Sequence, residues 1–337
     1  MRKLSSATGS GSSIVGYSLV VAGLLFGDLV VFGAGKPARP DLEKYLQRIG
    51  YEPILLERDE DNHLTVRALL DGRRRNFMVD TGWAMTTVSK ATVRRLKTLG
   101  ELGVKLEDSF LGTLSDSSMV LMEKLTLGPA DFLNQPAEAM KLNMEGRSFG
   151  HDGVLGCDFL VRNQCLIDCL DKRLYVRRDK APVEVLAALK KTLAGSGFSE
   201  VRLNVKLNLA MTCNAKANGR PVKLLVDTGA IWSLFDESQV KPLGLKVRGT
   251  GMKVVGVGRM GSQIVMVSRL DSFEFEGVSL QKVDFGVADL KGWGIAENKG
   301  LLENVQGILG AELLAKNGAL IDCRGLTLWL RPLKSVK

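Results

Sequence analysis

The sequence contains the same short phrase twice, and this repetition constrains the fold more than any other feature. Apolar residues lead into Asp-Thr-Gly at residues 80–82 and again at residues 227–229, 147 positions further along. A second pair of segments, residues 156–169 and 310–323, aligns without gaps and is identical at seven of fourteen positions. Each segment follows its own Asp-Thr-Gly by a similar interval, so we infer that the chain contains two copies of one unit.

Two joined copies predict a two-lobed molecule with pseudo-twofold symmetry, in which equivalent residues meet at the axis. We expect a leader over residues 1–35, a first lobe over 36–180 and a second lobe over 181–337. Short apolar runs alternate with Asp-Gly or Asn-Gly turns in both copies, which is typical of β-hairpins. Helical spacing is confined to residues 41–49, 90–98, 183–193 and 311–316. We therefore predict an all-β fold with a few short helices.

The expected twofold symmetry suggests a chemical role for the repeated Asp-Thr-Gly. An apolar strand ends at Asp80 and another at Asp227, and the glycine two residues later lets the backbone turn sharply. Two such turns facing each other across a twofold axis bring two carboxylates together. Like charges at close range cannot both ionise, so one pKa rises and the pair shares a proton. Such a dyad can deprotonate a water while it protonates a carbonyl oxygen, which hydrolyses a peptide bond without a metal or a covalent intermediate.

These residues resemble the aspartic peptidases, and within them the retropepsin-like branch more than the pepsins. The resemblance spans residues 60–333 in two copies. Hydroxyl residues stand six positions after each aspartate, at Thr86 and Ser233, as the family pattern requires. Apolar-apolar-Gly triplets at residues 154–156 and 308–310 match the strand that crosses behind each aspartate loop in the family.

The resemblance implies a small closed acid-protease β-barrel in each lobe, a hairpin flap over the cleft, and no cofactor or metal. It assigns catalysis to Asp80 and Asp227. The neighbouring residues that it assigns to support of this pair are Thr81, Gly82, Thr228 and Gly229. The candidate flaps are residues 110–121 and residues 254–265, and the second contains the substrate-binding candidates Gly256, Gly258 and Gly261. The implied substrate is an extended peptide or protein, and a chain that holds both lobes is expected to work as a monomer.

The first copy departs from the family pattern at Trp83, where the second copy has Ala230. The usual residue is small because it lies beside the aspartate and the cleft. Trp83 either lines a substrate pocket, crowds that pocket, or packs under the barrel, and we also count it as a substrate-binding candidate. A second hypothesis therefore stays open, in which the chain is a catalytically inactive peptide-binding module with the same fold.

The rest of the composition excludes several other functions. The net charge of +9 does not indicate nucleic-acid binding, because the basic residues are spread along the chain without a recognisable binding motif. Only two histidines occur. His63 lies in a polar turn and is expected to be solvated, while His151 has no counterpart in the second copy and does not suit a symmetric mechanism.

Two equivalent pairs of residues lie in the aligned segments. Asp168 and Asp322 are expected to cap turns at the ends of strands. Cys169 and Cys323 follow them, and a disulfide between the lobes requires the fold to bring these two side chains together. The five cysteines are too few for a disulfide scaffold, and their spacing does not match a zinc site.

The first 35 residues differ from the rest of the chain. Two basic residues precede a Ser/Gly stretch and an apolar run over residues 14–35, which Asp28 interrupts. The run is long enough for an uncleaved membrane anchor, and it ends in small residues as a signal peptide does. We expect export to the periplasm, the membrane surface or the outside of the cell, and leave open whether the segment is cleaved.

Overall fold

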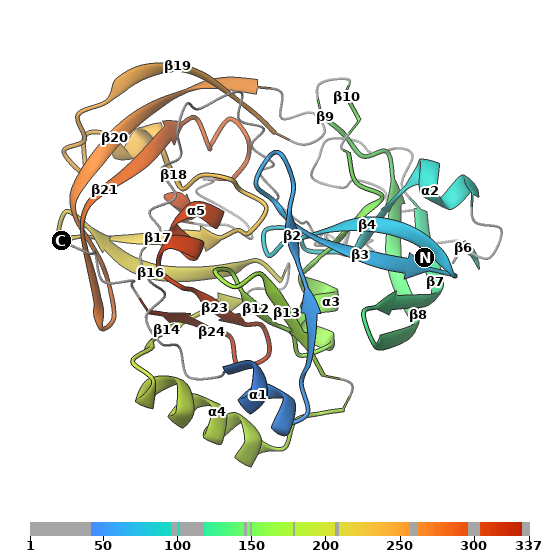
Figure 1. Ribbon diagram of the computed structural model, residues 1–337. Helices are drawn as coiled ribbons and strands as arrows, with labels where there is room; N and C mark the ends of the chain where they lie inside the picture. Colours follow the sequence, from blue (N-terminus) through green and yellow to red (C-terminus); the bar gives the residue numbers. More distant parts are fainter. Residues whose placement is uncertain are drawn as a thin grey trace, which may run out of the picture.

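The computed structural model describes residues 42–95, 100–101, 118–144, 147–148, 150–177, 179–205, 209–256, 262–295 and 304–331. Within these ranges the chain forms two β lobes above a shared sheet (Figure 1). The expected leader lies outside the described residues, so export stays a prediction. None of the helices in the described ranges has the length and apolarity that a bilayer crossing needs.

The first lobe is a closed barrel. Its strands are β2 (Glu57–Arg58), β3 (Leu64–Leu70), β4 (Arg73–Val79), β5 (Thr87–Ser89), β6 (Gly100–Glu101), β7 (Ser118–Leu127), β8 (Ala130–Met140) and β11 (Gly153–Leu155). They are ordered β2-β3-β4-β11-β5-β8-β7-β6, and an additional pairing of β3 with β7 closes six of them into a ring. Helix α2 (Lys90–Arg95) follows β5, and β9 (Asn143–Met144) pairs with β10 (Arg147–Ser148) as a separate ribbon.

The second lobe repeats this plan. Its strands are β15 (Asn204–Val205), β16 (Met211–Ala217), β17 (Arg220–Val226), β18 (Leu234–Asp236), β19 (Arg248–Val255), β20 (Ser262–Phe275), β21 (Val278–Ala288) and β22 (Gly307–Leu309), with a short 3-10 helix η1 (Glu237–Gln239). The order β15-β16-β17-β22-β18-β21-β20-β19 matches the first lobe strand for strand, and β16 closes on β20. The predicted all-β, two-lobed fold and the internal duplication are therefore confirmed.

The hairpins that lead to the two Asp-Thr-Gly phrases have the predicted turns. Asp71 and Gly72 have φ angles of 47° and 78°, and Asn218 and Gly219 have φ angles of 48° and 74°. Positive φ at both central residues is the type I′ geometry, whose twist matches that of the flanking strands. Because the side-chain period of a strand is two, these short turns also fix which residues of β4 and β17 face the barrel interior.

The turn between β2 and β3 corrects one expectation. His63 was predicted to be solvated, but its side chain is buried at 1% exposure. Its ring Nδ1 lies 3.0 Å from Asp59 Oδ2, and its backbone N–H donates to Asp59 Oδ1 at 2.8 Å. A polar sequence did not reveal that the turn folds back on itself and encloses the imidazole.

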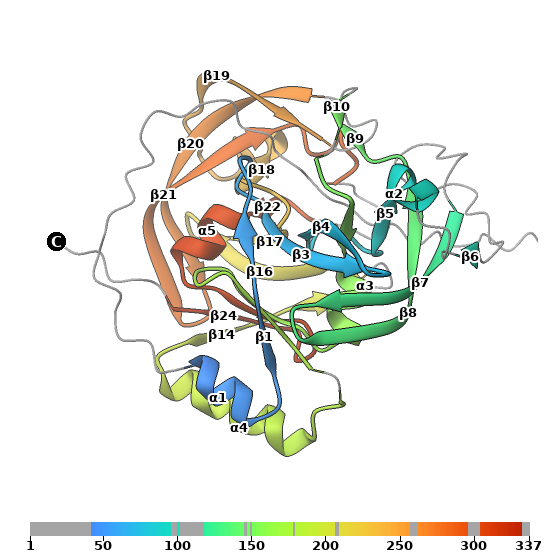
Figure 2. The same ribbon diagram turned by 45° about the vertical axis from the view of Figure 1, so that its right-hand side comes forward.

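A six-stranded sheet joins the two lobes (Figure 2). Its strands, in spatial order, are β1 (Glu52–Leu55), β13 (Arg173–Val176), β12 (Leu166–Asp168), β23 (Leu320–Asp322), β24 (Thr327–Leu330) and β14 (Ser199–Arg202). At its centre β12 and β23 are antiparallel, with Ile167 opposite Ile321. Equivalent residues of the two copies thus face each other, which places the pseudo-twofold axis between these strands.

Side chains alternate across this sheet and serve two cores. Leu166 and Leu320 pack with α1 (Leu42–Arg48) and α4 (Val183–Gly195), which lie on the outer face of the sheet (Figure 1). The isoleucines on the axis point the other way and join the main core that runs through both barrels. The sheet is therefore buried on both faces at its centre.

Among the described residues, four of five α-helices lie where helical spacing predicted them, and one member of an equivalent pair was missed. Helix α5 (Ala311–Lys316) was predicted, but its equivalent α3 (Cys157–Arg162) was not. The segment of α3 contains Phe159 and Val161, which have weak helix propensity, whereas α5 is rich in Ala and Leu. The segment of α3 is nevertheless helical, as its equivalent α5 is, so its place in the duplicated fold outweighs its weak helix propensity.

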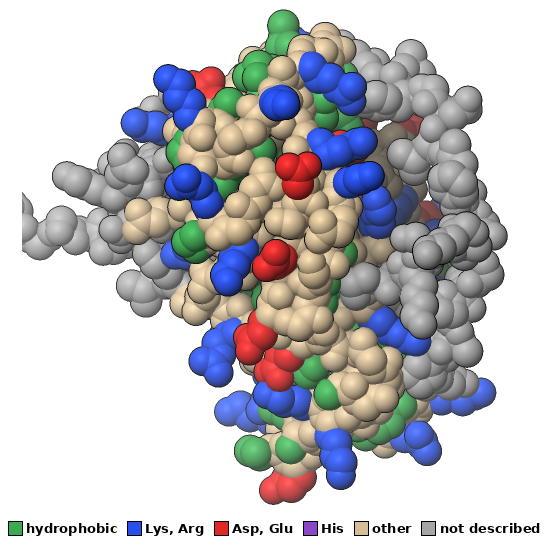
Figure 3. Space-filling view, turned by 90° about the vertical axis from the view of Figure 1, so that its left-hand side faces the viewer, with side chains coloured by type: hydrophobic (Ala, Val, Ile, Leu, Met, Phe, Trp, Pro, Cys, Tyr) green, Lys and Arg blue, Asp and Glu red, His purple; other side chains and the backbone are tan. Residues whose placement is uncertain are grey.

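Charged side chains on the outer surface of the second lobe are dispersed. Figure 3 shows Lys and Arg scattered over this face among Asp, Glu and apolar side chains. An ion pair also links two long strands of this lobe, since Arg269 Nε of β20 lies 2.6 Å from Asp284 Oδ1 of β21. This face presents no concentrated basic patch among its described residues.

We expect substitution at the axis to destabilise the whole molecule. Ile167→Ala should lower the free energy of unfolding by about 2–5 kcal/mol, because the side chain is fully buried and leaves a cavity between the lobes. Leu55→Ala in β1 of the same sheet is the control, since Leu55 is 59% exposed and its loss should cost about 0.5 kcal/mol or less. Urea denaturation measures both, and equal losses would contradict the proposed role of the axis.

Candidate active site

The two Asp-Thr-Gly phrases follow equivalent strands and meet at the centre of the molecule. Asp80 comes directly after β4 and Asp227 directly after β17, and both side chains are fully buried. The backbone N–H of Asp80 donates to Leu155 O at 3.1 Å, and that of Asp227 donates to Leu309 O at 3.0 Å. The strands β11 and β22 therefore hold the start of each loop from behind.

Each carboxylate lies against the glycine of the opposite loop. A Cβ atom on Gly82 would lie 2.4 Å from Asp227 Cγ, and one on Gly229 would lie 2.2 Å from Asp80 Oδ2. Only glycine fits at such an approach. Within its own loop Gly82 N donates to Asp80 Oδ1 at 2.7 Å, while Gly229 N and Ala230 N donate to Asp227 Oδ1 at 2.9 and 3.0 Å.

The two threonines lock the loops together reciprocally. Thr81 N donates to Thr228 Oγ1 at 3.0 Å, and Thr228 N donates to Thr81 Oγ1 at 3.1 Å. Each hydroxyl in turn donates at 2.8 Å to a valine carbonyl of the other lobe, Val226 for Thr81 and Val79 for Thr228. Both hydroxyls thus donate and accept across the interface, and the aspartates beside them are held in register.

The downstream glycines pass directly behind the aspartate loops. A Cβ on Gly156 or Gly310 would collide with the loop backbone at 2.8 or 2.5 Å. Gly156 N donates to Thr86 Oγ1 at 3.2 Å, and Gly310 N donates to Ser233 Oγ at 2.8 Å. These contacts give the hydroxyl residue of each copy a structural role in fastening the loop to the strand behind it.

Sequence reasoning missed a partly buried acidic residue beneath each of these hydroxyl residues. Asp158 Oδ1 accepts from Thr86 N at 2.6 Å and from Thr86 Oγ1 at 2.7 Å. Glu312 Oε1 accepts from Ser233 N at 2.8 Å, and burial raises the pKa of Glu312 to about 7. A signal was present, because Asp158 and Glu312 occupy the same position of the duplicated segments and both are acidic.

Cys157 is a second contact that the sequence did not predict. Its Sγ donates to Thr81 O at 3.1 Å, directly beneath the first aspartate loop. Burial raises the pKa of this thiol well above its usual value, and the nearby Asp80 adds to the shift, so the sulfur keeps its proton and remains a donor. The second lobe has Ala311 at this position, so the support is asymmetric.

The other equivalent pairs have structural roles. Asp168 Oδ1 accepts from two backbone N–H groups of the turn that follows it, and Asp322 Oδ1 does the same, which confirms the prediction that both residues cap turns. Cys169 and Cys323 are buried and form no disulfide, and the same holds for the other three cysteines. The structure therefore contains no bridge between the lobes at these positions.

Trp83 lies within the first lobe. Its side chain is 3% exposed, and its indole Nε1 donates to Thr87 Oγ1 at 2.8 Å, at the start of β5. Its backbone carbonyl accepts from Cys157 N at 2.7 Å. These contacts give Trp83 a packing role beside the first aspartate loop, and its assignment to substrate binding stays a prediction.

The candidate flaps are described only in part. β19 and β20 form an antiparallel pair, which is the hairpin shape expected for the second flap. Gly256 directly follows β19 and is buried, whereas Gly258 and Gly261 lie outside the described residues. In the first lobe, residues 110–117 of the candidate flap also lie outside the described residues.

Burial and the neighbouring carboxylate together disfavour the ionised form of the dyad. Burial raises the pKa of Asp80 well above its usual value, and the charge of Asp227 raises it further, while hydrogen bonds from Gly82 and Gly229 act in the opposite direction. The dyad, by which we mean Asp80 and Asp227, therefore retains one proton well above the pH at which an exposed aspartate ionises. That proton belongs to the pair and not to one residue.

Comparison with known proteins found one family and one solved structure to which the chain is similar. A family model described as "Aspartyl protease" matches residues 66–159 and 213–313, one segment in each lobe and each with its aspartate. Among solved structures, the chain is similar to a retropepsin-like aspartic protease from Rickettsia conorii, with 20% identity over 37% of this chain and 90% of that chain and a TM-score of 0.29. A search of curated proteins found no match.

Removal of one threonine hydroxyl should weaken the interface between the loops. Thr81→Val keeps the shape of the side chain but leaves Thr228 N and Val226 O buried without partners, at about 1–3 kcal/mol for each group. We expect the free energy of unfolding to fall by about 2–6 kcal/mol in urea denaturation. Thr81→Ser retains the hydroxyl and should lose about 1 kcal/mol or less, and equal losses in the two variants would argue against the hydrogen bonds as the cause.

The raised pKa of Asp80 predicts a pH-dependent effect of its replacement. A carboxyl whose folded pKa is raised stabilises the fold below its unfolded pKa of about 3.9, and this contribution is lost as the pH rises through the folded value. Asn does not titrate. The thermal stability of Asp80→Asn, measured relative to that of the natural chain, should therefore rise as the pH is raised from acid to neutral. The exposed Asp271→Asn is the control and should show no such trend.

Proposed function

This chain belongs to the aspartyl protease family, and we propose that it is an endopeptidase that cleaves peptide bonds with a water held between Asp80 and Asp227. One observation carries the proposal. Both Asp-Thr-Gly loops are intact and interlocked, so that each carboxylate reaches the glycine of the other loop. Two buried carboxylates in this arrangement share a proton, which is the state that acid–base hydrolysis needs.

In the proposed reaction the dyad both accepts and supplies a proton. One carboxylate takes a proton from the water as its oxygen attacks the carbonyl carbon, and the other gives its proton to the carbonyl oxygen. The dyad then again holds one proton, which passes to the amide nitrogen as the C–N bond breaks. A hydroxyl of the tetrahedral intermediate returns a proton to the dyad. The balance closes without a metal, a cofactor or a covalent intermediate.

The protein contributes fixed dipoles to this reaction. Backbone N–H groups of Gly82, Gly229 and Ala230 point at the carboxylates, and the threonine hydrogen bonds hold these groups in place before substrate arrives. Donors that need no reorganisation stabilise developing charge more effectively than solvent does. An extended peptide would add to the edge of the β19–β20 hairpin by backbone hydrogen bonds, in the manner of an additional strand.

The inactive binding module is the alternative to this proposal. It rests on the bulk of Trp83, but the indole is buried against β5 and hydrogen-bonded to Thr87. The intact Asp, Thr and Gly of both loops support catalysis. A cleavage assay distinguishes an endopeptidase from an inactive peptide-binding module.

We expect the full chain to cleave an unstructured protein such as casein, with a bell-shaped pH dependence. Activity falls in acid, where both carboxylates are protonated, and falls again where both are ionised. Asp80→Asn and Asp227→Asn should each reduce kcat/KM by about 10²–10⁴-fold, and pepstatin should inhibit the natural chain. Cleavage is measured by the release of soluble peptides.

Asp271→Asn, at an exposed position of β20, is the matched control and should keep full activity. A natural chain that binds casein but cuts it at no pH would identify the binding module. Cleavage that survives both dyad substitutions would place the chemistry elsewhere.

A further inference from the structure

The only two histidines of the chain meet at one carboxylate oxygen in the first lobe. His63 Nδ1 lies 3.0 Å from Asp59 Oδ2, and His151 Nε2 lies 2.9 Å from the same atom. The two rings are nearly perpendicular, with centroids 6.3 Å apart. One potential ligand atom from each of the three residues lies within 4.8 Å of the others.

The backbone holds the first two of these residues in place independently of the cluster. Asp59 N donates to His63 O at 3.2 Å, and Asn62 N donates to Asp59 O at 3.0 Å, which closes the turn between β2 and β3. Asn62 has a φ of 64°, and its carbonyl accepts from Arg58 Nη1 at 2.7 Å. Asp59 and His63 are thus fixed side by side by a tight turn.

The third residue is anchored to strand β4. Asp152 N donates to Asn76 O at 2.9 Å, and Asn76 N donates to Asp152 Oδ2 at 3.0 Å. The neighbouring His151 is positioned by this pairing, and its Nδ1 lies 3.3 Å from the side-chain amide of Asn76. The three side chains are therefore brought together by two separate pieces of backbone, before any ligand contributes.

We propose that Asp59, His63 and His151 form a binding site for Zn²⁺. Two imidazole nitrogens and one carboxylate oxygen are a donor set that Zn²⁺ prefers, and the fourth tetrahedral position is left for water. Bonds of about 2.0–2.1 Å place tetrahedral ligand atoms about 3.3 Å apart. The two N···O pairs, at 2.9 and 3.0 Å, need to open by a few tenths of an ångström, and the two ring nitrogens, which lie within 4.8 Å of each other, need to reach the same spacing. Ca²⁺ and Mg²⁺ require more oxygen ligands than the cluster supplies.

Zinc binding requires each neutral ring to present a bare nitrogen, so each ring keeps its proton and moves it to the other nitrogen. For His63 this shift breaks no second hydrogen bond, because its Nε2 is buried without a hydrogen-bond partner among the described residues. For His151 the proton moves to Nδ1, which faces Asn76. A half-turn of the Asn76 amide presents its oxygen as the acceptor, as outer-shell partners of zinc ligands do.

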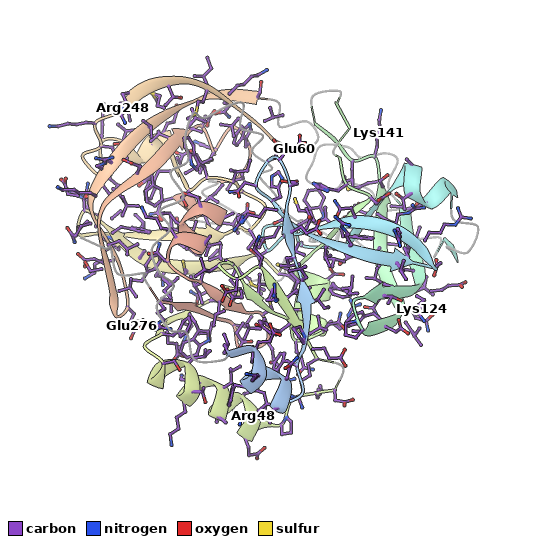
Figure 4. All side chains as sticks on the ribbon, viewed as in Figure 1. Arg48, Glu60, Lys124, Lys141, Arg248 and Glu276 are labelled. Carbon is purple, nitrogen blue, oxygen red and sulfur yellow. The ribbon has the colours of Figure 1, made fainter. Side chains whose placement is uncertain are left out.

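The charge of the turn suits a cation. The three residues include one carboxylate, that of Asp59. Glu60, exposed at the tip of the turn (Figure 4), and Asp61 add negative charge, while the guanidinium of Arg58 is tied to backbone carbonyls.

A zinc ion here would act on the stability of the first lobe. It would link the β2–β3 turn to the segment that enters β11, and β11 pairs with β4 just before the aspartate loop. Asn76 precedes Asp80 by four strand residues, or about 13 Å, so the ion would not contact the dyad. The site goes beyond the proposed protease activity and does not depend on it.

Titration of the metal-free full chain with Zn²⁺ tests this inference. We expect one ion per chain by calorimetry and a rise in thermal stability. Because the chain has only two histidines, its imidazole ¹⁵N signals report on the site directly, and both rings should shift together. His63→Gln and His151→Gln should each weaken binding by at least about 10-fold, since a lost ligand costs no less than a lost outer-shell partner.

Two control variants separate this site from other carboxylates. Glu60→Gln removes an exposed charge from the same turn and should weaken Zn²⁺ binding only slightly, because exposed charges interact weakly. Asp80→Asn removes half of the dyad and should bind Zn²⁺ like the natural chain. No binding up to about millimolar Zn²⁺ would overturn the proposal, as would binding that leaves both ring signals unchanged. Should a histidine variant fail to fold, the ring signals of the natural chain decide the question alone.

Discussion

The burial of two carboxylates side by side is the constraint on which the rest of the molecule depends. Neither Asp80 nor Asp227 has any exposed surface, and burying even one uncompensated charge is costly. The structure offsets this cost by sharing a proton and by aiming backbone N–H groups at the carboxylates. The close approach of the carboxylates also requires glycine at positions 82 and 229, because any side chain there would occupy the space of the opposite carboxylate.

Two sets of contacts hold the lobes in the register that this pair requires. The reciprocal threonine bonds act next to the carboxylates, and the six-stranded sheet acts at longer range, with Ile167 opposite Ile321 on the axis. The sheet is covered by α1 and α4 on one face and by the barrels on the other, so it cannot shift without disturbing both cores. Since both lobes belong to one chain, this register does not depend on protein concentration.

The sequence revealed the features that repeat and concealed those that depend on tertiary contacts. The duplicated phrases and the Asp-Gly and Asn-Gly turns are local patterns that occur in both copies, and from them the two equivalent β lobes could be predicted. The burial of His63 did not follow, because the turn around it reads as polar and only its folded shape encloses the ring. Asp158 and Glu312 were equally hidden, although their shared position in the aligned segments was a usable signal.

A single chain also allows the two halves to differ where chemistry does not require symmetry. The proposed reaction uses both aspartates, held by both threonines and both glycines, and these residues are identical in the two copies. Around them the first lobe has Trp83 and Cys157 where the second has alanines, and only the first lobe contains histidines. Cys157 contacts the first aspartate loop, Trp83 follows Asp80 in that loop, and His151 lies beside Asn76 of β4. The first aspartate loop is thus supported by side chains that a symmetric pair of identical subunits would have to carry twice.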